Sequence, residues 1–532
     1  MRLLEKVSRP FTLFLLFYLI LFLQFPLKGD LPGNCDSLLA IALSNNYFNK
    51  VFYNLDLSSL YPATSVHAYG DLAPLLASLF TFFKLISFDD LYAYYFFIVL
   101  IFALNAFAFY KLAFQTTKKN DVAIVIGLMF SLSTPFFAHI DDPNIIFLFF
   151  PLMLLYNLFC YKDTGQQKYA TYAMICLGLQ IYFGFYIFLF SIFFFLVFYQ
   201  KIKLKDFVIL ILLISPILGA YFYNHFHREV WFPWNNREIM KESALSFSNF
   251  FMALPGNLIY DSQKLTSTDT AYWIWIRKHS LIGLTLFLLA LIGLFKKFNL
   301  RVFILLIVPT LFSLLFQFDF FLDIFTTLPF GKYFRVPSRF SLIILLALCI
   351  FAAKGLSYTL NKYPSKRLLF LCLLFSFHLF EHLSFPLQSF HYKTLLKPDP
   401  LYTNYFSQQS KRSILLDLPS HAGMKWLTPS QERIWDYNRE MLYMNWQTYH
   451  KQIILNGTNG YLPFFRKSLD LYLKSPFSLR SLTYFKKLGV EYIIFHKNLV
   501  LSSQENVYKN LLNSNNLDLI EENENLAIFR LI

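Results

Sequence analysis

Long apolar segments run through most of the sequence, and they restrict the chain to the folds that a membrane allows. Of the 532 residues, 56% are hydrophobic and only 15% are charged, whereas soluble domains carry about 25% charged residues. A helix rises about 1.5 Å per residue, so an apolar stretch of roughly 17 to 25 residues can cross a bilayer. This predicts a polytopic α-helical membrane protein. We expect about eleven spans, two of them short and within 169–199, in the segments 10–27, 91–114, 122–138, 145–161, 169–199, 206–223, 280–295, 302–318, 339–356 and 368–385.

The basic residues predict how these spans are oriented. The formal net charge is +15 and the pI is about 9.3, a balance that would suggest a nucleic-acid partner in a soluble protein. Here Lys and Arg gather in short loops at alternate ends of the spans, which indicates the cytoplasmic side. We therefore expect no nucleic-acid binding, a cytoplasmic N-terminus and an external C-terminus in a bacterial inner (cytoplasmic) membrane. Residues 72–87 are apolar but short, and we expect them to lie in the interface or to insert only half-way.

The first loop outside the hydrocarbon, residues 28–71, carries acidic side chains close to the end of the first span. Acidic groups at that place are costly unless they are solvated or used. Asp30 and Asp36 are candidate catalytic residues, because a carboxylate can act as a general base or bind a divalent cation such as Mg²⁺ or Mn²⁺. His67 and Asp71 are candidate substrate-binding residues at the far end of the loop. The alternative for Asp36 is an ordinary helix cap, because Ser37 and an apolar run follow it.

A second polar cluster is expected on the same face, in the loop after residues 122–138. His139, Asp141 and Asp142 combine imidazole and carboxylate groups, which suit metal binding or acid-base chemistry. Asp142 is a further candidate catalytic residue, and His139 and Asp141 are candidate substrate-binding residues. The alternative is that Asp-Asp-Pro-Asn only forms a turn.

Two arginines lie where the span 339–356 begins at the outer face. The guanidinium groups of Arg335 and Arg339 present planar pairs of donors that match a phosphate, and a lipid phosphate would lie at this depth. The alternative is that both side chains only anchor the helix end at the interface.

Other motifs point less strongly to chemistry. His378, Glu381 and His382 are one helical turn apart near the last outer end, a spacing with which a metal site is conceivable, although which metal would bind is unknown. The sequence has no Walker loop, no Gly-x-Gly-x-x-Gly and no Gly-x-Ser-x-Gly, so a cytosolic nucleotide-driven enzyme has no support.

The chain divides by composition into residues 1–385, with external loops 28–71 and 224–272, and residues 386–532. In the second part, short β-rich runs alternate with helical stretches, which predicts a small external, periplasmic α/β domain. The expected strands are 413–418, 452–455, 490–496, 517–520 and 526–531, and the expected helices are 431–446, 479–488 and 504–513.

Together these features resemble the GT-C superfamily of polytopic glycosyltransferases, and more narrowly the bacterial YfhO-like and related GT-C membrane proteins. The resemblance implies that Asp36 takes the acidic position of the first loop, with Asp30 as the alternative, and that Asp141 or Asp142 supplies the second acidic residue. The matching pieces are Cys35-Asp36-Ser-Leu-Leu, Tyr61-Pro62, Ser133-Thr-Pro135 through His139, Pro151-Leu, Arg335-Val-Pro-Ser-Arg339-Phe, Leu416-Asp417-Leu-Pro419, Asn456-Gly-Thr-Asn-Gly460-Tyr and Lys487-Leu-Gly-Val-Glu-Tyr492-Ile-Ile-Phe-His496.

Two functions follow as hypotheses. The first is a membrane glycosyltransferase that passes a sugar from a polyprenyl-phosphate-linked donor to an envelope glycan or lipid acceptor on the outer face, with membrane lipids as its surroundings. The second is a non-enzymatic scaffold or transporter for envelope glycan or lipid assembly. Ion-coupled transport is disfavoured, because transporters tend to carry ionisable residues at the midplane and these spans are almost free of charge.

Overall fold

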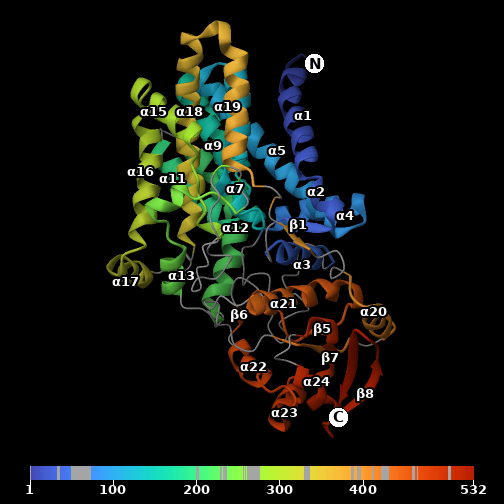
Figure 1. Ribbon diagram of the computed structural model, residues 1–532. Coiled ribbons are helices and arrows are strands. Elements are labelled where there is room, and N and C mark those ends of the chain that lie inside the picture. Colours follow the sequence, from blue (N-terminus) through green and yellow to red (C-terminus); the bar gives the residue numbers. More distant parts are fainter. Residues whose placement is uncertain are drawn as a thin grey trace.

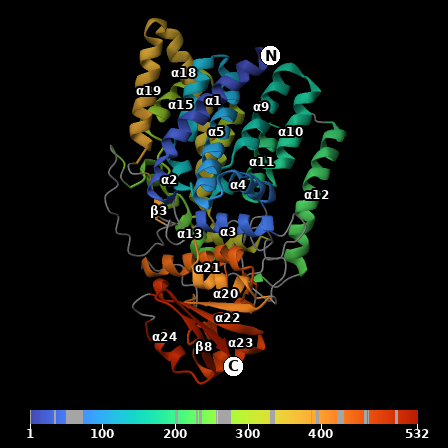
Figure 2. The ribbon, with the colours of Figure 1, turned by 90° about the vertical axis from the view of Figure 1, so that its right-hand side faces the viewer.

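A computed structural model of the chain is shown in Figure 1. It describes residues 2–32, 36–49, 73–198, 203–227, 230–231, 236–255, 257, 259, 276–328, 336–384, 387, 389–391, 397–409, 412–420, 431–457, 462–463, 465–500 and 505–532. A helical bundle forms one end of the molecule and a small sheet with its helices forms the other (Figures 1 and 2). The N-terminus lies at the far end of the bundle, and the C-terminus lies beside the sheet.

The bundle has a helix in every segment that the apolar pattern predicts. The segment 169–199 contains two helices separated by a turn at 181–184, as expected. The helices of this part are α1 (Arg2–Phe22), α2 (Gln24–Lys28), α4 (Pro74–Ser87), α5 (Asp90–Thr117), α6 (Asn120–Ser131), α7 (Thr134–Ala138), α8 (Pro143–Ile146), α9 (Phe149–Thr164), α10 (Gln167–Gln180), α11 (Phe185–Phe198), α12 (Leu204–His227), α15 (Leu284–Lys296), α16 (Leu300–Leu315), α17 (Asp319–Thr327), α18 (Phe340–Lys362) and α19 (Arg367–His382).

Length and composition allow several of these helical stretches to cross a membrane. A sixth candidate joins five others if α16 and α17 form one span, although they are bent by 101° at their break. Helix α4 has 14 residues and is shorter than the unbent candidates, as are the apolar helices α11 and α15. The chain is thus a mostly helical, multi-pass membrane protein. The five unbent candidates are Arg9–Lys28, Asp90–Thr117, Asn120–Ala138, Pro143–Thr164 and Pro337–Lys362.

Glycine allows α15 and α18 to pack with their backbones in close contact. A Cβ atom on Gly293 of α15 would lie 1.9 Å from the Phe351 carbonyl oxygen, and one on Gly355 of α18 would lie 1.9 Å from the Leu289 carbonyl oxygen. Side chains at either position would force the helices apart. In a membrane, where the lipid is as apolar as the helices, such close contact supplies much of the packing energy.

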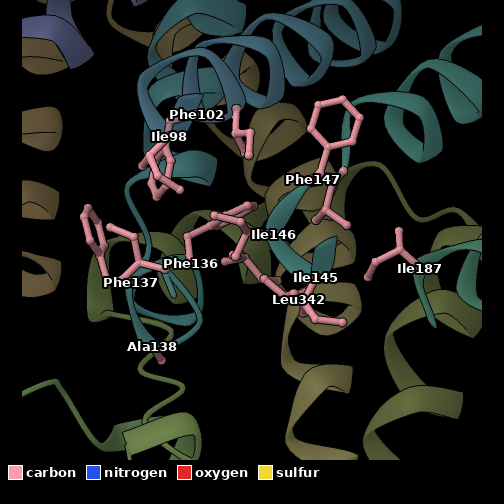
Figure 3. Close-up of a cluster of buried hydrophobic side chains, with 14 of the residues drawn as sticks. Ile98, Phe102, Phe136, Phe137, Ala138, Ile145, Ile146, Phe147, Ile187 and Leu342 are labelled. Carbon is pink, nitrogen blue, oxygen red and sulfur yellow. The ribbon is translucent and has the colours of Figure 1, made fainter. Parts of the chain in front are cut away.

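A cluster of buried apolar side chains holds the segments on both sides of residues 139–142 (Figure 3). Helices α7 and α8 flank this loop, and both insert apolar side chains between α5, α11 and α18. The loop is therefore fixed at both ends by packing. The labelled members of the cluster are Ile98, Phe102, Phe136, Phe137, Ala138, Ile145, Ile146, Phe147, Ile187 and Leu342.

The C-terminal part contains a five-stranded sheet in the order β5-β4-β7-β9-β8. Strand β4 runs parallel to β5 and β7, and the pairs β7–β9 and β8–β9 are antiparallel. The five strands and the helices α21, α23 and α24 agree closely with the predicted ranges, whereas α20 and α22 were not predicted. Their bounds are β4 (Ile414–Leu418), β5 (Ile453–Ile454), β7 (Val490–His496), β8 (Leu517–Glu522), β9 (Leu526–Leu531), α20 (Pro400–Ser407), α21 (Gln431–His450), α22 (Phe465–Leu473), α23 (Leu479–Lys487) and α24 (Glu505–Leu512).

Helix α3 (Asp36–Asn49) joins the first loop to the C-terminal part by packing against α21 (Figures 1 and 2). The Asn45 side chain donates hydrogen bonds to Asn445 (2.9 Å) and to Asp90 (3.2 Å). Lys84 donates to Asn45 (2.8 Å) and forms an ion pair with Asp90 (2.9 Å). This buried polar group therefore connects α3, α4, α5 and α21.

Two short ladders add further connections. Strand β1 (Asp30–Pro32) pairs with β3 (Ser389–His391), and β2 (Val230–Trp231) pairs with β6 (Leu462–Pro463). Each ladder joins one of the two predicted external loops to residues beyond 385. Helix α13 (Asn236–Ser243) follows β2 and lies at the end of the bundle that faces the sheet (Figure 1).

Candidate functional site

Two aspartates and two arginines meet at the end of the bundle. The Arg339 guanidinium lies 2.9 Å from the Asp142 carboxylate, and that of Arg277 lies 3.5 Å from Asp142 and 3.8 Å from Asp141. All four residues are buried, with exposed fractions between 3% and 9%. We call these four residues the Asp–Arg cluster. Its formal charge is balanced, because two carboxylates face two guanidinium groups.

Local structure places the two aspartates. They lie in the turn between α7 and α8, where the Asp142 N–H donates to the His139 carbonyl (2.9 Å) and the Asp142 carbonyl accepts from Ile145 (2.9 Å). Asn105 of α5 holds the next residues, because its side chain donates to the Ile146 carbonyl (2.7 Å) and accepts from the Leu148 N–H (2.9 Å). The Asp-Asp-Pro-Asn motif does form a turn, and that turn also delivers carboxylates to a buried charged site.

The arginines arrive from distant parts of the chain. Arg339 ends a 3-10 turn (Pro337–Arg339) at the start of α18, and its guanidinium carbon lies 4.4 Å from the ring centre of Tyr186 on α11. An arginine stacked on an aromatic ring keeps its fork of donors in a fixed plane. Arg277 lies just before α15, in a segment held by the hydrogen bond from the Ser280 N–H to the Asn249 carbonyl (3.1 Å).

The charges around Asp142 keep it ionised. Burial alone would raise the pKa of this carboxyl, but the positive charges of Arg339 and Arg277 outweigh burial and hold its pKa below the ordinary value. A carboxylate that is buried and ionised at neutral pH can bind a cation or, once its ion pair opens, accept a proton.

His139 lies beside the cluster with both ring nitrogens unused. The side chain is fully buried, and neither nitrogen has a hydrogen-bond partner among the described residues. Burial, and then the positive charges of Arg277 and Arg339, hold the pKa of His139 well below its usual value. The ring is therefore neutral, with one N–H donor and one lone pair available to a bound molecule.

The arrangement could bind a phosphate group and assist a proton transfer. Two guanidinium forks converge on one place, and forks of this kind bind phosphate oxygens in pairs. Carboxylate oxygens are also the ligands that Mg²⁺ and Mn²⁺ prefer, and two of them lie here together with the unused imidazole of His139. The donor set therefore fits a divalent cation.

The other predicted residues stand as follows. Asp30 begins β1, where it pairs with His391, and its side chain is buried. Asp36 is the first residue of α3, but its side chain lies outside what the structure describes. The remaining three candidates, His67, Asp71 and Arg335, lie outside the described residues.

Sequence reasoning missed Arg277 and Tyr186. Arg277 follows a run of aromatic and apolar residues just before the segment 280–295, which is where an outer helix end is expected. A single arginine at such a place resembles an interface anchor. Only its contacts with Asp141 and Asp142 distinguish it from one.

In sequence, the chain matches no protein-family model and no curated protein. In structure, it is similar to the arabinofuranosyltransferase AftD from mycobacteria, with a TM-score of 0.59 at 12% identity, covering 99% of this chain. The chain spans only 40% of the length of that protein. Weaker similarities are to the oligosaccharyltransferase AglB from Archaeoglobus fulgidus (TM-score 0.47, 13% identity, 93% of this chain and 70% of that one) and to ArnT from Cupriavidus metallidurans (0.46, 10%, 98% and 97%).

The similarity to AftD concerns the fold. It supports the GT-C-like architecture that the motifs predict, because a solved glycosyltransferase shares this arrangement over nearly the whole chain. The narrower YfhO-like resemblance stays a prediction. Activity has to be argued from the Asp–Arg cluster, since folds host many functions.

Proposed function

We propose that the chain is a membrane glycosyltransferase of the GT-C type, which transfers a sugar from a polyprenyl-phosphate-linked donor to an envelope glycan or lipid acceptor. The observation that carries this proposal is the buried Asp–Arg cluster: two carboxylates and two guanidinium groups at the end of the bundle, in a fold like that of a known glycosyltransferase.

The arginines act on the leaving group. During transfer the bond between the anomeric carbon and the phosphate oxygen breaks, and negative charge gathers on the polyprenyl phosphate that leaves. Arg277 and Arg339 stabilise that charge because their donors are held in a buried place with little water. Arg335, His139, Asp141, His67 and Asp71 complete the proposed binding residues for donor and acceptor.

A carboxylate acts on the acceptor. Its hydroxyl oxygen forms the new bond to the anomeric carbon, and its proton passes to a base as an oxocarbenium-like centre forms. Asp142 is in a position to accept that proton once the donor phosphate takes over its partner Arg339. Asp36, with Asp30 as the alternative, is the first candidate for this base, and Asp142 is the second.

A divalent cation, Mg²⁺ or Mn²⁺, fits the same residues. Asp141 and Asp142 would hold it with His139 as a further ligand, and it would supply positive charge to the phosphate oxygens of the donor.

We further propose that all eleven apolar segments span a bacterial inner membrane, with the N-terminus in the cytoplasm and residues 386–532 as an external, periplasmic domain. The packing of α3 against α21 supports this topology, because it requires the first loop and the C-terminal part to lie on one side.

The test is turnover of a labelled polyprenyl-phosphate sugar by purified protein. We expect Asp142→Asn to lower the rate by about 10²- to 10⁴-fold, the range that general-base catalysis contributes. The matched control is Asp121→Asn. It removes a carboxylate in the first turn of α6 that forms an ion pair with Arg367, outside the Asp–Arg cluster. The control should keep full activity.

Equal turnover by wild type and Asp142→Asn would contradict the enzyme proposal. Absence of any stabilisation of the wild type by polyprenyl phosphate, measured in detergent, would instead favour the scaffold.

A further inference from the structure

The last turns of α19 carry a second group of buried polar side chains. His378 and His382 are four residues apart and therefore share one face of the helix, and Glu381 lies between them. All three are fully buried, and their ligand atoms lie within 4.8 Å of one another. None of these residues belongs to the Asp–Arg cluster.

Hydrogen bonds orient both imidazole rings. His378 Nε2 lies 2.9 Å from the Met129 carbonyl, which leaves Nδ1 with its lone pair. His382 Nδ1 lies 3.1 Å from the Thr134 N–H and 2.9 Å from the Thr134 hydroxyl, which leaves Nε2. His378 Nδ1 has no hydrogen-bond partner among the described residues, and His382 Nε2 faces the Ile282 backbone without a hydrogen bond of normal geometry. The ring centres are only 4.1 Å apart.

The Glu381 carboxylate is held from the opposite side. It accepts hydrogen bonds from the Leu284 N–H (2.6 Å), the Thr285 N–H (3.1 Å) and the Thr285 hydroxyl (2.6 Å) at the start of α15. Carboxylates that bind metals are commonly fixed by such bonds.

A glycine leaves space between these ligand atoms. Gly283 has a φ of +76°, and a Cβ atom there would lie 2.5 Å from His382 Nε2 and 3.0 Å from Glu381 Oε2. The position that a side chain would fill is therefore bordered by an imidazole nitrogen and a carboxylate oxygen.

We propose that His378, Glu381 and His382 form a binding site for a transition-metal ion of the zinc type. Two imidazoles and one carboxylate are an established Zn²⁺ ligand set, whereas Mg²⁺ and Ca²⁺ prefer oxygen ligands. Zinc bonds of about 2.1 Å place tetrahedral ligands about 3.4 Å apart, so ligand atoms that are now up to 4.8 Å apart need to approach by up to about 1.4 Å. His382 Nε2 carries the ring proton while Nδ1 accepts from the Thr134 N–H, so binding would require that proton to move to Nδ1. There it would be donated to the Thr134 hydroxyl, and the bond from the Thr134 N–H to Nδ1 would be lost.

Such an ion would connect four helices. Its ligands come from α19, the residues that orient them come from α6, α7 and α15, and α7 leads directly into the turn that holds Asp141 and Asp142. The site is thus a positioning device for that turn. It does not depend on the proposed glycosyltransferase activity.

The experiment measures zinc in the purified full chain, prepared without a histidine tag, loaded with Zn²⁺ and dialysed. We expect about one zinc per chain in the wild type and less than a tenth of that in His378→Ala and His382→Ala. The control Cys372→Ser removes an exposed thiol of the same helix and should retain the zinc.

Loading with Co²⁺ decides the matter if the histidine variants fail to fold. The wild type should then show the intense visible absorption of four-coordinate cobalt with nitrogen and oxygen ligands, and Zn²⁺ should abolish it. Less than a tenth of a zinc per chain in the wild type, or equal zinc in wild type and folded histidine variants, would overturn the proposal.

Discussion

Buried ion pairs occur in two regions of this molecule, and they differ in how completely their hydrogen-bonding groups are used. In the C-terminal part, Arg466 is fully buried and bonds to Asp470 (2.7 Å), to Glu440 (3.2 Å) and to the Gly457 carbonyl (3.0 Å). Every nitrogen of this guanidinium has a partner. A charge that is matched on all sides has no capacity for a ligand, so we assign Arg466 to stability.

The Asp–Arg cluster of the bundle is less complete. Only the pair between Arg339 and Asp142 is as short as 2.9 Å, and the contacts of Arg277 are 3.5 and 3.8 Å. The Nε of Arg339 has no hydrogen-bond partner among the described residues, and the same holds for both nitrogens of His139. Unused buried donors cost free energy unless something binds them. The comparison teaches that two buried arginines differ in how fully their donors are used: every nitrogen of Arg466 is bonded, whereas the Nε of Arg339 is not.

The largest loss of stability is expected from removing Arg466, whose guanidinium nitrogens are all bonded. Arg466→Ala leaves Glu440 and Asp470 buried without their cation, which costs about 3 to 5 kcal/mol of stability. Chemical unfolding in detergent should show this loss, and failure to accumulate folded protein agrees with it. An unchanged unfolding midpoint would contradict the assignment of Arg466 to stability.

The incomplete cluster should respond in activity instead. Arg339→Lys keeps the charge but loses the planar fork, and we expect a drop of about 100-fold in kcat/KM, equivalent to about 2.7 kcal/mol. Its unfolding midpoint should change far less than that of Arg466→Ala. If Arg339→Lys lost stability and kept its turnover, Arg339 would have to be assigned to stability rather than to the site.

Acid should sharpen the comparison through His139. Because its pKa is lowered in the folded protein, the unfolded chain binds a proton below about pH 6.5 where the native state does not. Above that pH, His139 takes nothing from the free energy of unfolding. Below it, the free energy of unfolding falls by about 1.4 kcal/mol per pH unit. His139→Gln should therefore flatten the decline in stability between pH 6.5 and 5.

His450 of α21 is the matched control, since burial, and then the charge of His496, lower its pKa to about 3. His450→Gln should flatten the stability profile in the same way but leave the pH profile of turnover unchanged. Identical turnover profiles for all three proteins would contradict a role for His139 in the site.

The smallest change in stability is expected at the start of α6, outside the Asp–Arg cluster. Asp121 pairs with Arg367 on a partly exposed surface, and pairs of that kind contribute less than about 1 kcal/mol. Asp121→Asn should change the unfolding midpoint little at low salt and less at high salt. A loss of stability as large as that of Arg466→Ala would show that buried, fully bonded ion pairs do not stabilise this protein more than partly exposed ones.

Much of the fold could be predicted because its causes are local. The apolar period places helices in all the expected segments, and the alternation of β-branched runs with turns places β4, β7 and β9 where the structure has them. Asp142 and Arg339 could each be named as candidates, because a charged side chain at the end of an apolar helix is costly unless it is solvated, paired or used.

The sequence by itself determined a helical membrane protein with an α/β C-terminal part, and it exposed the candidate residues at 139–142 and at 339. Only the tertiary structure decided that Arg277 joins Asp142, that Asn45 meets Asn445, and that Gly283 opens a space between His382 and Glu381. The physical reason is range. Hydrophobic periodicity acts over neighbouring residues, whereas these contacts join segments far apart in the chain and depend on how the helices pack.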